Sequence, residues 1–85
     1  RMMKVDNLTD KQIIDHIMNG NNDEMKESLQ LALNGIWGIK ADKNQTIKLA
    51  KQALKENKIL HCTFIDGESC DETNAQDSYL KLWIE

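Results

Sequence analysis

Four side chains with the chemistry of metal ligands or nucleophiles lie close together in the sequence: His61, Cys62, Cys70 and Asp71. Closed zinc sites need four ligands, and their paired cysteines are roughly two to four residues apart. Seven residues separate Cys62 from Cys70, and strand alternation would turn His61 and Cys62 to opposite faces. We therefore predict no metal and no cofactor, and interpret Cys62 as a core residue. The spacing leaves open a single disulfide between the two cysteines.

Covalent catalysis has weaker support. A nucleophile needs a neighbouring base and a third group that orients the base. Cys70 and His61 form the one such pair that the sequence offers, and no Gly-rich phosphate loop accompanies them, because Gly35 and Gly38 are isolated. We predict a binding protein with no catalytic residues.

A lysine-rich segment is the clearest functional signal in a chain whose net charge is −3. Residues 40–60 carry six lysines against Asp42 and Glu56, a net charge of +4, whereas residues 1–39 have a net charge of −2 and residues 61–85 of −5. A basic surface attracts anions such as DNA phosphates, so this pattern constrains the partners of the chain. Lysine and glutamine are also good helix formers, and a solvated helix surface is the alternative interpretation.

Two helices are expected before this segment. The first begins at the capping box of Thr9 and Gln12 and ends at Asn19-Gly20. The second begins at Asn22 and ends at Asn34-Gly35. Their predicted core residues recur at helical spacing: Ile13, Ile14, Ile17, Met18, Met25, Leu29, Ala32, Leu33 and Ile36.

The lysine-rich segment itself predicts a third helix, which Asp42 caps and which ends at Asn57 or Lys58. Its core positions are Ile47, Ala50 and Leu54, with Ala53 at the margin. Leu49 falls among the outward residues, where the core does not explain it. Trp37, in the connector before this helix, is expected to pack in the core.

The period changes from helix to strand after Ile59. Residues 60–65 alternate, Asp66-Gly67 signals a turn, and residues 79–85 alternate again beyond a long acidic loop. Two strands of matching length predict an antiparallel hairpin, and Trp83 then lies beside Tyr79 on the face opposite the apolar residues. The alternative makes residues 71–84 a helix. The predicted fold class is α+β, three helices followed by an antiparallel two-stranded hairpin.

The detailed pattern of residues 31–85 resembles a winged helix-turn-helix domain. Gly38-Ile39 ahead of Asp42 is similar to the turn before a recognition helix, and residues 45–60 resemble that helix running into the first strand of the wing. Two features depart from the family: the connector from Gly35 to Asp42 is longer than its tight turn, and the loop between the strands is acidic. A weaker likeness to Sel1-type helical repeats rests on residues 34–39, but such repeats need several stacked copies.

The resemblance implies a transcriptional regulator whose third helix enters the major groove of double-stranded DNA. Lysines would then neutralise phosphates, and amide side chains would read adenine edges. The implied DNA-binding residues are Lys43, Asn44, Gln45, Lys48, Lys51, Gln52 and Lys55.

The acidic loop argues against DNA, because phosphates repel it. The alternative function is a protein-interaction module or small inhibitor protein. Its candidate binding residues are Leu49, Asp71, Glu72, Tyr79 and Trp83.

Length and composition are compatible with both functions. The 85 residues suggest one domain, residues 1–85, and 40% hydrophobic with 29% charged residues is typical of soluble globular domains. No apolar run approaches the roughly 20 residues that cross a bilayer, and no secretory signal begins the chain. We therefore expect a cytoplasmic protein without a membrane partner, and a homodimer is compatible with either function.

Overall fold

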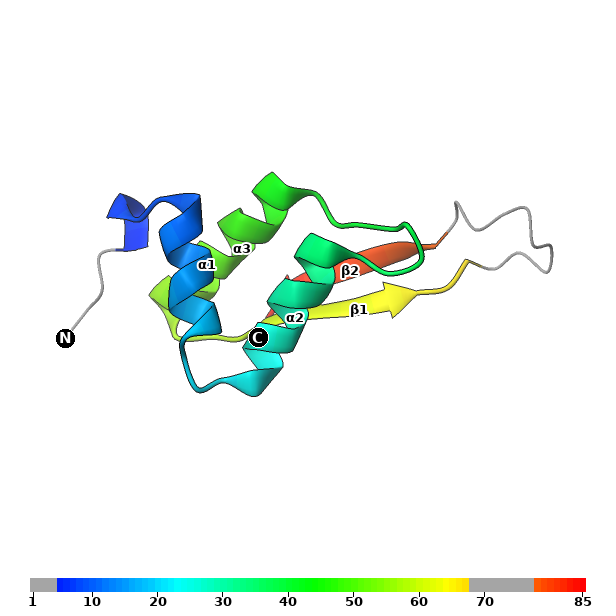
Figure 1. Cartoon of the computed structure of the whole chain (residues 1–85). Helices are drawn as coiled ribbons and strands as arrows, with labels where there is room; N and C mark the ends of the chain where they lie inside the picture. Colours follow the sequence, from blue (N-terminus) through cyan, green and yellow to red (C-terminus); the bar gives the residue numbers. More distant parts are fainter. Residues whose placement is uncertain (1–4, 68–77) are drawn as a thin grey trace.

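The computed structural model describes residues 5–67 and 78–85, in which three helices are followed by a two-stranded antiparallel hairpin (Figure 1). A short 3-10 turn, η1 (Val5–Asn7), precedes the helices α1 (Asp10–Met18), α2 (Asp23–Asn34) and α3 (Lys43–Glu56). The hairpin consists of β1 (Leu60–Ile65) and β2 (Tyr79–Ile84). The predicted α+β fold is confirmed. No helix in the described part of the chain is long and apolar enough to cross a membrane.

The helix starts follow from the capping residues that the sequence predicted. At α1, the Gln12 amide donates to Thr9 Oγ1 at 3.2 Å while the Thr9 amide donates to Gln12 Oε1 at 2.9 Å. Asn22 and Asp42 accept hydrogen bonds from the third residue of α2 and α3, at 3.0 Å in both cases. Asn57 ends α3 in the left-handed conformation, with φ of 55°. Each of the three N-cap side chains satisfies an otherwise unpaired amide and stabilises its helix by about 1 kcal/mol.

The core lies where the three helices meet the base of the hairpin. Its fully or nearly fully buried apolar residues are Val5, Ile13, Ile17, Met25, Leu29, Ala32, Ile47, Ala50, Ala53 and Leu60. Thr46 is also buried, and its hydroxyl is satisfied there because it donates to the Asp42 carbonyl at 2.8 Å. Ala53 is therefore central rather than marginal, and Leu54 is half-buried at the edge of the core.

Leu49 does not point outward as expected. It is half-buried and packs against the core. α3 packs against α1 and η1 as well as against α2 and the hairpin. These additional neighbours make the apolar side of α3 wider than its periodicity alone predicts. The prediction that Leu49 points outward is wrong, because packing against the core accounts for this side chain.

The connector between α2 and α3 contains a tight two-residue turn. Ile36 and Ile39 exchange both backbone hydrogen bonds at 2.9 Å, and the two residues between them have positive φ, 52° at Trp37 and 79° at Gly38. This is the type I′ geometry of a β-hairpin turn. Because the central residues of such a turn project from the chain, Trp37 is 77% exposed. The expectation that it packs in the core is wrong.

The two faces of the hairpin carry the residues that alternation predicts. One face faces the helices and carries Leu60, Cys62, Phe64, Leu80, Leu82 and Ile84. The other face carries His61, Thr63, Ile65, Tyr79, Lys81 and Trp83. α2 packs along β1 and α3 contacts β2, and the far half of the hairpin extends past the helices (Figure 1). Residues 79–84 are therefore strand and not helix, whereas 71–77 lie outside the described residues.

Candidate binding surfaces

The predicted DNA-binding residues all lie on α3, and most of them face solvent. Lys43, Asn44, Gln45, Lys48, Gln52 and Lys55 are exposed, and Lys51 is half-buried. Gln45, Lys48, Gln52 and Lys55 lie on the helix side opposite the core, Asn44 and Lys51 lie toward one edge, and Lys43 is the first residue of the helix. The sequence therefore located this surface, which we call the lysine surface. Whether its charges are available to a partner depends on their neighbours.

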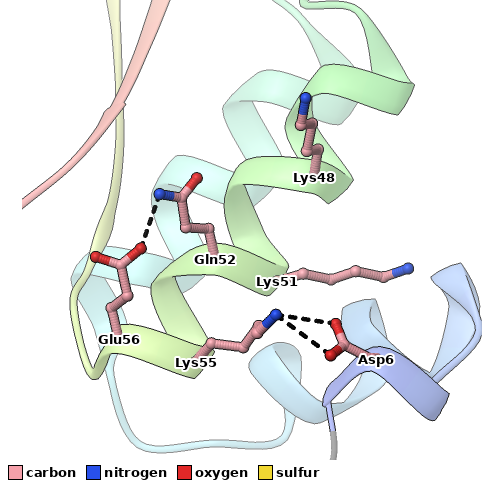
Figure 2. A pocket seen from close by; sticks show the side chains of 6 residues that line it. All are labelled: Asp6, Lys48, Lys51, Gln52, Lys55 and Glu56. Carbon is pink, nitrogen blue, oxygen red and sulfur yellow. Dashed lines mark hydrogen bonds and ion pairs between the residues drawn. The ribbon is translucent and has the colours of Figure 1, made fainter.

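Two of the lysines already contact acidic residues from the N-terminal segment. Lys55 Nζ lies 3.1 and 3.3 Å from the two carboxylate oxygens of Asp6 (Figure 2). Lys51 Nζ lies 4.0 Å from Asp10 Oδ1. These side chains are partly exposed, so each pair adds at most about 1 kcal/mol to stability. Their larger effect is on the electrostatic potential of the surface, since the two carboxylates neutralise the C-terminal half of the lysine surface.

The same half forms a shallow pocket of about 420 Å³ lined by Asp6, Lys48, Lys51, Gln52, Lys55 and Glu56 (Figure 2). The Gln52 amide that was predicted to read a base instead donates to Glu56 Oε2 at 2.7 Å. Hydrogen bonds from Gln52 and Lys58 hold the pKa of Glu56 below its ordinary value, so this carboxylate remains an acceptor at neutral pH. Within the pocket, Lys48 has no ion pair with a described residue.

The predicted protein-binding residues are dispersed. Leu49 lies against the core, and Asp71 and Glu72 lie outside the described residues. Tyr79 is 53% exposed near the far end of the hairpin. Trp83 is on the outward face, as predicted, but it is half-buried rather than free.

A contact across the hairpin and one along its own strand cover part of Trp83. Its ring stacks on His61 with centroids 5.1 Å apart and planes 17° apart, and Lys81 Nζ lies 5.4 Å from its centroid. His61 Nδ1 also lies 3.1 Å from Glu24 Oε1 at the start of α2. Trp83 thus belongs to a contact that ties the hairpin to α2, which makes it a poor candidate for a free binding anchor.

Trp37 is an exposed aromatic residue that the sequence did not predict to be at the surface. Its ring packs edge-on against Phe64, with centroids 5.0 Å apart and planes 81° apart. Phe64, Ile36 and Ile39 are half-buried and do not belong to the helical core. We call these four residues the Trp37 cluster. The sequence carried only part of the signal for this turn, because type I′ turns favour Asn, Asp or Gly at both central positions and only Gly38 fits that preference.

The thiol and imidazole groups do not assemble into a reactive centre in the described part of the chain. Cys62 is half-buried, and its burial raises the pKa of the thiol, so the reactive thiolate is disfavoured. His61 points to the opposite face of the hairpin and contacts Glu24. No group of three or more His, Cys, Asp or Glu side chains comes together among residues 5–67 and 78–85. Cys70, and with it the disulfide left open above, lies outside the described residues.

Comparisons with protein-family models, curated proteins and solved structures find no match to this chain. The function is therefore inferred from the two surfaces themselves.

Proposed function

We propose that this chain is a protein-interaction module that binds its partner through the Trp37 cluster. The observation that carries the proposal is the 77% exposure of Trp37. Tryptophan is among the residues most enriched at the energetic centres of protein interfaces. Its exposure here offers a large apolar surface at the tip of a turn.

The backbone around Trp37 supports this role because it is held in place. Two hydrogen bonds of 2.9 Å close the turn, and Phe64 supports one edge of the indole. A bulky residue with positive φ is unfavourable, by about 1–2 kcal/mol relative to the right-handed region. A rigid anchor loses little conformational entropy when it binds, so this geometry favours affinity.

The chemistry of the cluster defines the partner in general terms. A projecting indole with aliphatic neighbours fits a protein surface with an apolar pocket of similar width. Tyr79, also exposed, lies on the face of the hairpin opposite Phe64 and is therefore separate from the Trp37 cluster. The proposed binding surface is centred on Trp37, whereas the sequence suggested the acidic loop and the face of Tyr79 and Trp83.

Affinity capture with two matched baits tests the proposal. Wild-type protein and the Trp37→Ala variant are immobilised and exposed to extract of the source cells, and the captured protein is then titrated against each bait. We expect the variant to bind at least about 30-fold more weakly, which corresponds to a loss of about 2 kcal/mol. Trp83→Phe serves as the matched control, since it changes the other tryptophan while keeping an aromatic ring against His61. Equal affinity of wild type and Trp37→Ala would rule out the proposed anchor.

Double-stranded DNA is the second candidate partner, and a specific feature of α3 favours it. Lys43, Asn44, Gln45 and Lys48 are exposed in the N-terminal half of the helix, and Lys43 and Lys48 form no ion pair with a described residue. Recognition helices contact base edges with their N-terminal residues. The far half of the lysine surface, by contrast, is occupied by Asp6 and Asp10.

Fluorescence anisotropy of labelled duplex DNA distinguishes this function. DNA binding through α3 predicts an affinity that falls steeply with salt and is lost in Lys43→Glu and Lys48→Glu. Lys55→Glu is expected to change it less, because Asp6 already neutralises that lysine. Absence of binding at low salt rejects DNA as the partner.

A further inference from the structure

The outer edge of β2 has unpaired backbone groups at three regularly spaced residues. Ile59 and Glu85 exchange both backbone hydrogen bonds, at 3.1 Å each. In an antiparallel ladder such pairs alternate with pairs that exchange none. Tyr79, Lys81 and Trp83 therefore direct their amide and carbonyl groups toward β1, and Leu80, Leu82 and Ile84 direct theirs to the opposite side.

That opposite side has no backbone hydrogen-bond partner in the described part of the chain. The sheet contains β1 and β2 alone, and no backbone hydrogen bond from residues 5–67 or 78–85 reaches Leu80, Leu82 or Ile84 from outside it. An unpaired edge is a template for another strand unless charges, proline or bulges block it. β2 contains no proline, and Lys81 is its one charged residue.

We propose that the edge of β2 pairs with β2 of a second copy of this chain, antiparallel, with Leu82 opposite Leu82. In this register Leu80 lies opposite Ile84 of the second copy. Each of the three outward residues then exchanges both hydrogen bonds across a two-fold axis, and the two hairpins form one four-stranded sheet. Such an isologous contact closes after two copies.

The side chains of β2 match in this register on both faces. Leu80, Leu82 and Ile84 extend the apolar face across the dimer axis. On the other face, Lys81 lies opposite Trp83 of the second copy, and Tyr79 lies opposite Glu85. The Trp83 ring already contacts His61 and its own Lys81, so the Lys81 of the second copy would contribute the apolar stem of its side chain to the contact.

Charge distribution favours the same register. The two Lys81 side chains are diagonal neighbours across the axis, and each is also diagonal to Glu85 of the other copy, which offsets their repulsion. Moving the axis from Leu82 to Leu80 or Ile84 keeps the hydrogen-bonding parity but leaves part of β2 unpaired. Self-pairing centred on Leu82 is thus the register that uses the whole strand. This contact is independent of the Trp37 cluster.

Two substitutions at one position test the backbone pairing. The Leu80 amide points to the outer edge, so Leu80→Pro removes an edge donor while leaving the β1–β2 hydrogen bonds in place. Leu80→Ala shortens the same side chain but keeps the amide. Sedimentation equilibrium is expected to show dimers for the wild type and Leu80→Ala, and monomers for folded Leu80→Pro. A monomeric wild type across the accessible concentration range would overturn the proposal, as would a dimeric Leu80→Pro.

Amide hydrogen exchange of the wild type gives a second readout that needs no variant. In a monomer the amides of Leu80, Leu82 and Ile84 face solvent and exchange fast. We expect their exchange to slow as the protein concentration rises, while the amides of Lys81 and Trp83 stay slow throughout. Dimers without protection at these three amides would show that the copies associate elsewhere. Trp37→Ala is expected to leave dimerisation unchanged, which separates this contact from the proposed partner site.

Discussion

Replacing Trp37 with asparagine tests whether this residue serves binding or folding. At 77% exposure the side chain buries about a quarter of its surface. For a tryptophan of roughly 250 Å² this is about 60 Å², or about 1.5 kcal/mol at ~25 cal/mol/Å². The edge-on contact with Phe64 adds about 1 kcal/mol. Trp37→Asn removes both the buried area and the contact with Phe64.

The backbone acts in the opposite direction. Trp37 has φ of 52°, and relief of this strain returns about 1–2 kcal/mol, because asparagine adopts the left-handed region readily and Asn-Gly is a favoured type I′ pair. The net cost of Trp37→Asn is therefore about 1 kcal/mol. Leu29→Ala, at a fully buried core position, is expected to cost about 3 kcal/mol or more.

Urea unfolding followed by far-UV circular dichroism measures both variants on one scale. We expect Trp37→Asn to keep a midpoint close to wild type and Leu29→Ala to lower it markedly. A loss for Trp37→Asn as large as that for Leu29→Ala would refute the reasoning, since the indole would then be a structural residue rather than an anchor held at the surface.

Three further predictions concern single groups. Gly35→Ala is expected to destabilise the fold by about 2 kcal/mol or more, because φ is 77° and an added Cβ would collide with the Ile39 carbonyl. Gly38→Asn is expected to cost little, because asparagine tolerates the φ of 79° and an added Cβ meets no atom there. Urea unfolding compares the stability of the two variants. Asp42→Ala removes the cap of α3 and is expected to cost about 1 kcal/mol by the same measurement, with Asp42→Asn retaining most of the stability. Burial raises the folded pKa of Cys62 above its ordinary value of 9.0, so the stability that this thiol contributes is present below pH 9.0 and is lost as pH rises through the folded pKa. In a Cys70→Ser background, alkylation of Cys62 should be slower in the folded than in the unfolded protein, and equal rates would contradict this.

Local signals in the sequence were sufficient for most of the fold. Thr9, Asn22 and Asp42 marked the helix starts because a cap acts within one turn, and alternation in residues 60–65 and 79–84 indicated both strands and the residues on each face. The prediction was wrong at Trp37, where size suggested burial and where tryptophan is not a residue that marks a type I′ turn. A tight turn overrides the tendency of an aromatic residue to be buried, because backbone geometry decides where the side chain projects.

The remaining differences depend on contacts between distant segments. Pairing of Lys55 with Asp6 and of Lys51 with Asp10 joins α3 to the N-terminal segment, and no local pattern reveals it. The same is true of Leu49, whose burial depends on neighbouring elements, and of the His61–Trp83 stack, which requires the strands to be paired. The lysine surface could thus be located from the sequence, but its partial neutralisation could not.

Photo-crosslinking from position 37 tests the central claim most directly. Trp37 is replaced with a photoreactive aromatic amino acid, and the protein is irradiated in extract of the source cells with an excess of either unlabelled wild type or Trp37→Ala as competitor. The proposed function predicts one main crosslinked protein, whose yield falls with wild-type competitor and persists with Trp37→Ala. No discrete product, or equal competition by both proteins, would contradict the assignment of Trp37 as the binding anchor.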